Sequence, residues 1–192
     1  MRIIAGTARG RRIEAPEGKN TRPTLDRVRE NLFNILQMNI RDSRVLDLFA
    51  GSGALSIEAL SRGAERATLV DSDRNASRIQ KKNLEALGFA GRADVMLCDW
   101  KQAAAELIRG GRQYDIVFLD PPYRMTDLRE VFSALEKLLS EDGLVVLEHE
   151  AKAKVTFGEA FEETDRRQWG YCGVTFYRLT KECRNSTGGE DI

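Results

Sequence analysis

Four apolar segments of this chain each lead into an aspartate, and this recurrence constrains the fold more than any other feature. The segments at residues 44–46, 67–70, 93–98 and 114–119 precede Asp47, Asp71, Asp99 and Asp120. Each is apolar enough for a buried strand, and helical patterns separate them. Strands that alternate with helices form a parallel sheet, whose carboxyl ends share one edge. The sequence therefore predicts an open α/β sheet with four carboxylates along one edge.

The rest of the chain continues the alternation. Helices are expected at residues 25–38, 54–60, 73–87, 101–108 and 128–139, and further strands at 144–148, 161–168 and 174–179. Gly88, Gly110-Gly111 and Asp142-Gly143 supply the stop signals. In the first helix Thr24 is the expected N-cap, and the expected buried side consists of Val28, Leu32, Phe33, Ile35 and Leu36.

A glycine loop joins the first of these strands to its helix. Residues 47–53 read Asp-Leu-Phe-Ala-Gly-Ser-Gly. Glycines at 51 and 53 let the backbone turn sharply and approach a ligand, and the following helix N-terminus offers N–H donors. Ser56 stands where the dinucleotide fingerprint has its third glycine, and Asp47 would repel a pyrophosphate but attract an ammonium or sulfonium group. This pattern favours S-adenosylmethionine over NAD as the cofactor.

Two further acidic strand ends fit the same cofactor. Asp71 follows Gly51 by twenty residues, the spacing at which an acidic side chain accepts ribose hydroxyls. Asp99 and Trp100 together offer an acceptor for an adenine amine and a flat apolar surface. Each aspartate taken alone is more typical of a helix N-cap. Their occurrence on one sheet edge favours ligand binding.

The fourth strand end carries Asp120-Pro121-Pro122-Tyr123. Successive prolines cannot continue a strand or donate backbone hydrogen bonds, so they form a stiff turn. The Asp120 carboxylate and the Pro121 carbonyl are then acceptors for an exocyclic amino group, and Tyr123 offers a ring on which a base can stack. The alternative is a structural turn that only closes the strand. The other three strand ends favour a grip on a nucleobase amine.

With these motifs, the chain resembles the class I S-adenosylmethionine-dependent methyltransferases that modify exocyclic amines of nucleic-acid bases. The runs at residues 1–6, 9–12 and 22–33 narrow the resemblance to the RsmD family of bacterial small-subunit ribosomal RNA guanine-N2 methyltransferases. The resemblance covers roughly residues 1–180. It implies a Rossmann-like, seven-stranded, mostly parallel sheet with a C-terminal antiparallel hairpin, preceded by a short hairpin and helix.

The resemblance also implies roles for individual residues. It assigns catalysis to Asp120, Pro121, Pro122 and Tyr123, and cofactor binding to Thr24, Asp47, Phe49, Ala50, Gly51, Ser52, Gly53, Asp71, Ser72, Asp99, Trp100 and Asp120. The expected domains are a basic extension at 1–40 that contacts RNA and cofactor, a catalytic domain at 41–181 and a flexible tail at 182–192. One guanine of ribosomal RNA, free or in an assembling small subunit, is the implied substrate of a monomer.

Basic residues are concentrated at the start of a chain whose net charge is zero. Residues 1–44 hold ten Lys or Arg and five Asp or Glu. Cations around short β-like pieces suggest a hairpin laid against a phosphate backbone. The alternative is an ordinary solvated face. The expected RNA-binding residues are Arg2, Arg9, Arg11, Arg12, Lys19, Arg22 and Arg27.

Composition limits the other function classes. With 192 residues and 42% hydrophobic content, the chain can bury a core of its own. It shows no apolar membrane span or signal peptide, so we expect a cytoplasmic protein. The three cysteines are irregularly spaced and His149 is the only histidine, which predicts neither a disulfide framework nor a metal site.

Three alternatives remain at this point. An adenine-N6 methyltransferase acting on DNA or RNA would use the same amine grip, although the chain has no added domain for reading DNA sequence. A non-catalytic RNA-binding module on the same fold would predict decayed motifs, whereas both motifs here are intact. A nicotinamide oxidoreductase is disfavoured by Ser56 and by the acceptors at Asp120 and Pro121.

Overall fold

The computed structural model describes residues 1–15, 23–122 and 124–183. The chain divides into two compact units, Met1–Ala103 and Ala104–Ile192. Tyr123, Lys19 and Arg22, all expected site residues, lie outside the described residues, as does the expected tail from residue 184 on. Each unit combines strands and helices.

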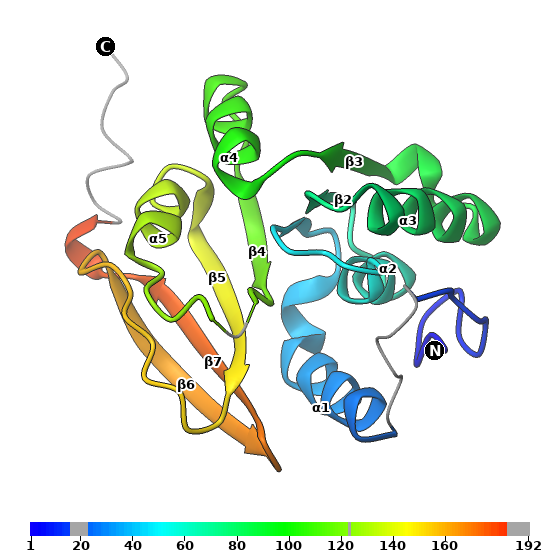
Figure 1. The fold of residues 1–192 in the computed structure, drawn as a ribbon, viewed down its shortest axis with the longest axis horizontal. Coiled ribbons are helices and arrows are strands. Elements are labelled where there is room, and N and C mark those ends of the chain that lie inside the picture. Colours follow the sequence, from blue (N-terminus) through cyan, green and yellow to red (C-terminus); the bar gives the residue numbers. More distant parts are fainter. Residues whose placement is uncertain (16–22, 123, 184–192) are drawn as a thin grey trace. The chain divides into compact units, whose positions relative to one another are not determined.

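The first unit contains three parallel strands, β1(Arg44–Asp47), β2(Arg66–Asp71) and β3(Ala93–Leu97), in the order β3-β2-β1 (Figure 1). Its helices are α1(Pro23–Ile40), α2(Ala54–Ser61), α3(Arg74–Leu87) and the 3-10 turn η1(Ala90–Arg92). Helix α2 packs on β1 and β2, and α3 packs on β2 and β3. The alternating strand and helix pattern is therefore confirmed in this unit.

Helix α3 shows why the sequence signals placed its ends correctly. The Asp73 side chain caps its first turn by accepting from the Asn75 N–H at 2.7 Å. Gly88 ends it with a left-handed φ of 76°, and its N–H bonds to the Glu85 carbonyl. Helix α1 begins earlier than expected, with Pro23 as its first residue, so the prediction that Thr24 is the N-cap was wrong. Proline suits this position because the first N–H of a helix has no intrahelical partner.

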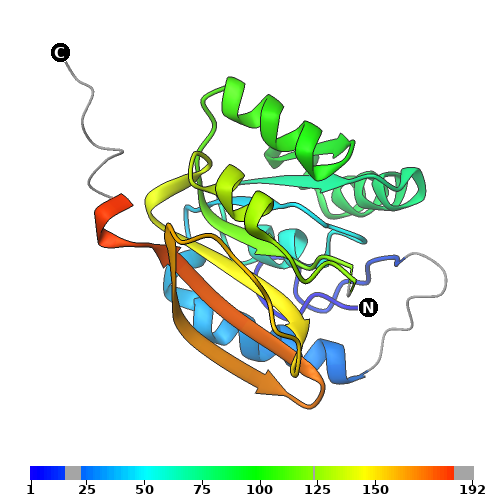
Figure 2. The same cartoon turned by 60° about the vertical axis from the view of Figure 1, so that its left-hand side comes forward.

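The second unit contains β4(Tyr114–Leu119), β5(Leu139–Glu150), β6(Phe161–Trp169) and β7(Cys172–Leu179) in the order β4-β5-β7-β6 (Figure 2). Strands β4 and β5 are parallel, whereas β7 runs antiparallel to both β5 and β6. Helix α4(Trp100–Arg109) precedes β4, and α5(Arg129–Leu135) lies between β4 and β5. The expected seven strands and the C-terminal antiparallel hairpin are confirmed.

Strand β5 is longer than expected. The predicted helix at 128–139 ends at Leu135, and the strand begins at Leu139, five residues before the expected start. The register with β4 shifts here, since Tyr114 pairs with Leu139 and Ile116 with Leu144. The Asp142-Gly143 signal therefore marks a bulge that takes up extra residues inside a strand, rather than a turn before it.

Both units have apolar cores. In α1 the side chains of Val28, Leu32, Phe33 and Leu36 are buried as expected, but Ile35 is 39% exposed and was wrongly assigned to the core. In the second unit Phe132, Phe161 and Tyr177 pack edge to face, with centroids 4.9 and 5.0 Å from Phe132. None of the helices at 23–122 and 124–183 offers an apolar stretch of the kind that spans a bilayer.

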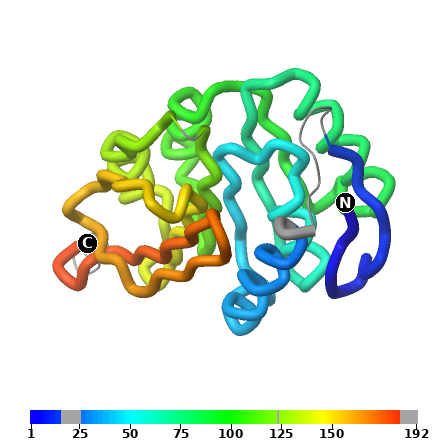
Figure 3. Tube along the Cα trace, turned by 60° about the horizontal axis from the view of Figure 1, so that its bottom comes forward, coloured from blue at the N-terminus to red at the C-terminus, as the bar shows by residue number. Residues whose placement is uncertain are grey.

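Residues 1–14 form an open hairpin that folds back on itself (Figure 3). An antiparallel bridge joins Arg2 and Arg12. It is flanked by hydrogen bonds from the Ile3 N–H to the Arg11 carbonyl at 3.0 Å and from the Ile13 N–H to the Met1 carbonyl at 3.1 Å. Ile3, Ala8 and Ile13 are buried. The predicted hairpin is thus present in a minimal form.

Candidate functional site

The glycine loop lies between β1 and α2 and needs glycine for steric reasons. Gly51 and Gly53 have φ values of 54° and 78°, in the left-handed region. A Cβ on Gly53 would come within 2.8 Å of Leu69 Cδ2. Gly53 also precedes α2 without any side-chain cap, so the loop presents backbone donors at the helix N-terminus.

Three side chains from outside the loop hold its shape. The Gly51 N–H donates to Asp71 Oδ2 at 2.8 Å, and the Gly51 carbonyl accepts from Gln80 Nε2 at 2.9 Å. Asn83 Nδ2 donates to the Ser52 carbonyl at 3.2 Å. The structure therefore brings Asp71 to the glycine loop, while its expected role toward ribose hydroxyls stays a prediction. Gln80 and Asn83 are supports that sequence reasoning missed.

Asp71 keeps acceptor capacity despite these contacts. Its Oδ1 accepts from the Asp73 N–H at 2.9 Å, so each oxygen receives one described hydrogen bond. An ionised carboxylate offers about four acceptor positions. The half-buried Asp71 side chain can therefore receive hydroxyl groups while it continues to hold Gly51.

Asp47 lies deeper than expected for a residue that meets a ligand. Its side chain is only 1% exposed, and Oδ2 accepts from Ser56 Oγ at 3.1 Å. The hydroxyl of Ser56, at the position of the third glycine in the dinucleotide fingerprint, thus donates a hydrogen bond to Asp47. Ala50 and Ser52 are also buried, whereas Phe49 is half-buried.

Asp99 and Trp100 begin helix α4. Asp99 Oδ1 accepts from the N–H groups of Lys101 at 2.8 Å and Gln102 at 3.0 Å, which is the N-cap role that competed with ligand binding in the sequence. The Asp99 side chain is exposed, and Lys101 Nζ lies 5.5 Å from the Trp100 ring centroid. Ser72, after β2, is also exposed.

In the second unit Asp120 directly follows β4 and is exposed, whereas Pro121 is buried and Pro122 exposed. The Met125 N–H donates to the Pro122 carbonyl at 2.7 Å, which closes the turn. Burial and, to a smaller extent, the nearby charge of Asp120 raise the pKa of the Glu148 carboxyl to about 7. A carboxyl group that titrates near neutrality beside Asp120 did not emerge from the sequence.

The expected RNA-binding residues fall into three groups. Arg2 Nη1 donates to the Gly10 carbonyl at 2.8 Å, and Arg11 donates to the Ala86 carbonyl, so these two also brace the hairpin. Arg9 and Arg12 are exposed on the hairpin, and Arg27 is exposed on α1. The remaining residues lie outside the described residues, as does the side chain of Thr24 in the first turn of α1.

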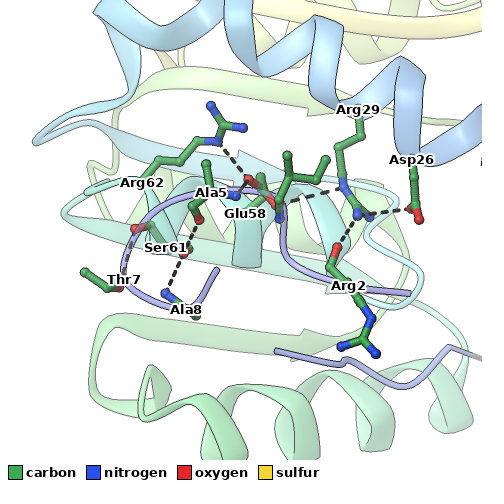
Figure 4. Close-up of polar contacts among 10 residues, drawn as sticks. Arg2, Ala5, Thr7, Ala8, Asp26, Arg29, Glu58, Ser61 and Arg62 are labelled. Carbon is green, nitrogen blue, oxygen red and sulfur yellow. Dashed lines mark hydrogen bonds and ion pairs between the residues drawn. The ribbon is translucent and has the colours of Figure 1, made fainter. Parts of the chain in front are cut away.

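A buried polar cluster docks the hairpin onto α2 (Figure 4). Glu58, with 0% exposure, accepts from the Ile4 N–H at 2.8 Å through Oε2 and from the Ala5 N–H at 3.0 Å through Oε1. Arg62 Nε donates to Glu58 Oε1 at 2.8 Å. One carboxylate on α2 thus satisfies two consecutive backbone donors of a segment that precedes it by more than fifty residues.

Arg29 joins α1 to the same cluster. Its Nη2 donates to the Arg2 carbonyl at 2.5 Å, and its Nε lies 4.0 Å from Glu58 Oε2. Burial lowers the pKa of the Arg29 guanidinium, against the opposing charges of Asp26 and Glu58. Sequence reasoning missed both residues, but a signal existed: Arg29 has helical spacing with the apolar Leu32, and Glu58 interrupts an apolar run.

Ser61 and Asn83 complete the docking. Ser61 Oγ donates to the Ala5 carbonyl at 2.6 Å and accepts from the Ala8 N–H at 2.9 Å. Asn83 exchanges hydrogen bonds with the Glu14 backbone at 2.9 and 3.0 Å while it also contacts Ser52. The basic hairpin and the glycine loop therefore share one supporting side chain. No cluster of metal-binding side chains occurs in the part of the chain that the structure describes.

Comparison with protein families gives a match between residues 1–178 and the family described as Conserved hypothetical protein 95. The chain belongs to this family. Among curated relatives, Ribosomal RNA small subunit methyltransferase D of Escherichia coli strain K12 is 45% identical over 154 residues, which cover 79% of this chain and 76% of the relative. The predicted family resemblance is therefore confirmed.

Solved structures confirm the fold class. The Escherichia coli protein yhhF, whose description assigns it provisionally to the methyltransferases, is 40% identical with a TM-score of 0.79, over 93% of this chain and 97% of that protein. A more distant protein, SMU.776, is described as complexed with SAH; it is 20% identical, has a TM-score of 0.68 and covers 79% of this chain and 49% of its own. At that identity the likeness supports the fold alone.

Proposed function

We propose that this protein is an S-adenosylmethionine-dependent methyltransferase that methylates the exocyclic N2 amine of a guanine in small-subunit ribosomal RNA. The observation that carries the proposal is the 45% identity to Ribosomal RNA small subunit methyltransferase D over 79% of this chain. The glycine loop and Asp120-Pro121-Pro122 are the chemical features of this chain that support it.

The first unit provides a setting that fits the cofactor. The space beside Gly53 excludes a Cβ, the α2 N-terminus lacks a side-chain cap, and the half-buried Asp71 retains acceptor capacity. In this proposal the loop amides meet the amino-acid end, Asp71 accepts from the ribose hydroxyls, and Asp99 with Trp100 holds the adenine. Further contacts are assigned to Thr24, Asp47, Phe49, Ala50, Ser52 and Ser72.

The second unit provides the acceptors for the substrate amine. Asp120 is exposed at the end of β4, and the turn after it is fixed by two prolines and by the bond from Met125 to Pro122. The Asp120 carboxylate and the Pro121 carbonyl hold the two amine hydrogens, and Tyr123 stacks on the base. These residues orient the nitrogen, which is the main contribution that a rigid turn can make to the rate.

When bound, S-adenosylmethionine supplies a methyl group on a positively charged sulfur, so the methyl carbon is already activated. The protein supplies position and fixed dipoles around a charge that moves from sulfur to nitrogen. The amine lone pair is delocalised into the guanine ring, so acceptors on both N–H groups favour a more pyramidal and more nucleophilic nitrogen. Asp120 is the carboxylate that faces the proton that this nitrogen must lose.

Exposed cations of the docked hairpin and of α1 are assigned to the RNA backbone. Arg9, Arg12 and Arg27 are exposed, and Arg2 and Arg11 retain donors beyond their contacts to carbonyls. Lys19 and Arg22 belong to the same basic segment of the sequence. We further propose that the protein acts as a cytoplasmic monomer on ribosomal RNA, either free or in an assembling small subunit.

Nucleoside mass spectrometry of small-subunit ribosomal RNA, from cells with and without the gene, tests this function. We expect loss of one N2-methylguanosine, restored by the wild-type chain but not by Asp120→Asn. Loss of N6-methyladenine instead would mean that the same amine-binding residues act on an adenine substrate. If neither nucleoside changes, the chain is not the proposed enzyme and the RNA-binding module becomes the better hypothesis.

A further inference from the structure

The register of the second unit places Asp120, Glu148 and Cys172 on one face of its sheet, where the exposed Glu150, which pairs with Cys172, is a further carboxylate. Strand β4 pairs with β5 up to Leu119 and Leu147, so the next positions, Asp120 and Glu148, are neighbours on the same face. On the other side of β5, Glu148 pairs with Val174. Cys172 lies two residues before Val174 and shares its face, because side chains alternate along a strand.

These three groups differ in their access to water. Asp120 is exposed, Glu148 is half-buried and Cys172 is 3% exposed. Burial and, to a smaller extent, the charge of Asp120 together raise the pKa of Glu148 to about 7, against the opposing effect of a hydrogen bond from the Cys172 thiol. Burial also raises the pKa of Cys172, with further contributions from Glu148 and Asp120, so the thiol stays protonated and acts as a donor.

The proposed reaction uses Asp120 but leaves Glu148 without a role. Two neighbouring carboxylates do not ionise independently, because the charge on one increases the affinity of the other for a proton. An isolated exposed aspartate is a weak base at neutral pH. The paired arrangement therefore alters the basicity of the one carboxylate that faces the amine.

We propose that Glu148 is a second carboxylate that acts through Asp120. The pair, and not Asp120 alone, then takes up the proton that leaves the amine as the new N–C bond forms. This inference rests on the proposed methyltransferase function. The amine lone pair forms the bond to the methyl carbon, the C–S bond breaks with its electrons going to sulfur, and the amine proton passes to Asp120 beside the ionised Glu148. The pair then returns this proton to solvent through the exposed Asp120. Glu148 is a positioning residue in this scheme, since only Asp120 touches the substrate.

The first test needs neither cofactor nor RNA. Carbon-13 NMR of labelled glutamate and aspartate carboxyls is followed against pH in the wild-type protein, with Glu148→Gln used to assign the Glu148 signal. We expect a midpoint near 7. Asp120→Asn should move this midpoint down because it removes a negative charge, and Cys172→Ala should move it up because it removes a hydrogen bond to the carboxylate.

A matched control comes from the same strand. Glu141 is an exposed glutamate near the start of β5, and Glu141→Gln should leave both the Glu148 midpoint and the activity unchanged. A Glu148 midpoint within half a unit of an ordinary glutamate, or a midpoint that does not respond to Asp120→Asn and Cys172→Ala, overturns the pairing. The two substitutions act in opposite directions, so failure of one variant to fold still leaves a decisive measurement.

The second test is the pH dependence of methyl transfer to RNA. In the wild-type enzyme kcat/KM should fall as pH drops below about 7, because the pair is then already protonated. In Glu148→Gln this acidic limb should move to lower pH, toward the range of an ordinary aspartate, and kcat at pH 8 should fall about tenfold with little change in the KM for RNA. An unchanged acidic limb in Glu148→Gln assigns it to another group and refutes the proposal. If the nucleoside assay shows no guanine methylation while the NMR midpoints shift as expected, the proposed function fails and the carboxyl pair stands.

Discussion

At Gly6 the backbone of the hairpin passes so close to α2 that no side chain fits. Its φ is 83°, and a Cβ there would lie 1.8 Å from the Ser61 carbonyl oxygen. Gly10 has a nearly equal φ of 79° but nothing within 4 Å of the corresponding Cβ. The two positions therefore separate the cost of a left-handed backbone from the cost of a steric clash.

We predict that Gly10→Ala lowers the unfolding free energy by roughly 1 kcal/mol through its backbone conformation alone. Gly6→Ala should cost roughly 1–3 kcal/mol more, because the hairpin must move away from α2 to relieve the clash. Urea denaturation of both variants measures the difference. Equal losses would show that the hairpin shifts without resistance.

The carboxyl of Glu148 makes stability depend on pH. Its folded-state pKa of about 7 lies above the ordinary value of 4.5, so the folded protein binds this proton more tightly than the unfolded chain. The resulting stabilisation is complete below pH 4.5 and is lost as pH rises through 7. It amounts to at most about 3.5 kcal/mol.

We therefore predict that Glu148→Gln is more stable than the wild type at pH 8 and that the difference disappears near pH 4. Thermal denaturation at a series of pH values measures this, with Glu141→Gln as the control on the same strand. A wild-type advantage at pH 8 would contradict the sign of the shift. If Glu148→Gln gains stability and loses methyl transfer, the buried carboxyl lowers stability but is needed for activity.

At the scale of secondary structure, α2 is the element on which the first unit depends. Through Glu58 it binds two hairpin amides and Arg62, and it lies within 4.0 Å of Arg29 on α1. The carboxylate is fully buried, so these donors compensate its charge in place of water. Removal of one member of such a group leaves the others desolvated without compensation.

For this reason Glu58→Gln should lower the unfolding free energy by about 3 kcal/mol. It should also speed hydrogen exchange at the Ile4 and Ala5 amides before global unfolding. Glu65→Gln, at an exposed position shortly after α2, should change stability by less than about 0.5 kcal/mol. Unaltered exchange at Ile4 and Ala5 would mean that Glu58 does not anchor the hairpin.

Elements were predictable where the signals are local. Asp73 and Gly88 bounded α3, and the strand, glycine loop and helix at 44–60 followed from a few adjacent residues. The predicted strand at 144–148 was shorter than β5 because the residues of the bulge at 140–143 have the composition of a turn. A bulge can be recognised only from the pairing with β4. The Asp120–Glu148 pair could not be predicted from the sequence for the same reason, since it depends on the register of two strands.

At the scale of the whole molecule, charge separates the start of the chain from the rest. Ten basic and five acidic residues lie within residues 1–44, although the net charge is zero. Composition indicated this asymmetry, but only the contacts show which cations are committed internally. Arg29 is buried in the cluster around Glu58, whereas Arg9 and Arg12 are exposed.

We predict that Arg9→Gln and Arg12→Gln each weaken RNA binding and reduce the slope of log affinity against log salt by about 1. Filter-binding titrations from low to moderate salt measure both quantities. Lys137→Gln, an exposed cation of the second unit, is the control and should leave the slope unchanged. If all three variants have the wild-type slope, these hairpin arginines do not contact the RNA.

The docking of the hairpin also has a consequence for the order of events during synthesis. Residues 4–14 find their partners in Glu58, Ser61 and Asn83, which lie 53 to 69 positions later in the chain. At about 5–20 residues per second, the ribosome adds these partners roughly 3–14 s after it has made the hairpin residues. During that interval the docking partners of the hairpin do not yet exist, so the first segment to be made is among the last parts of this unit to be fixed in place.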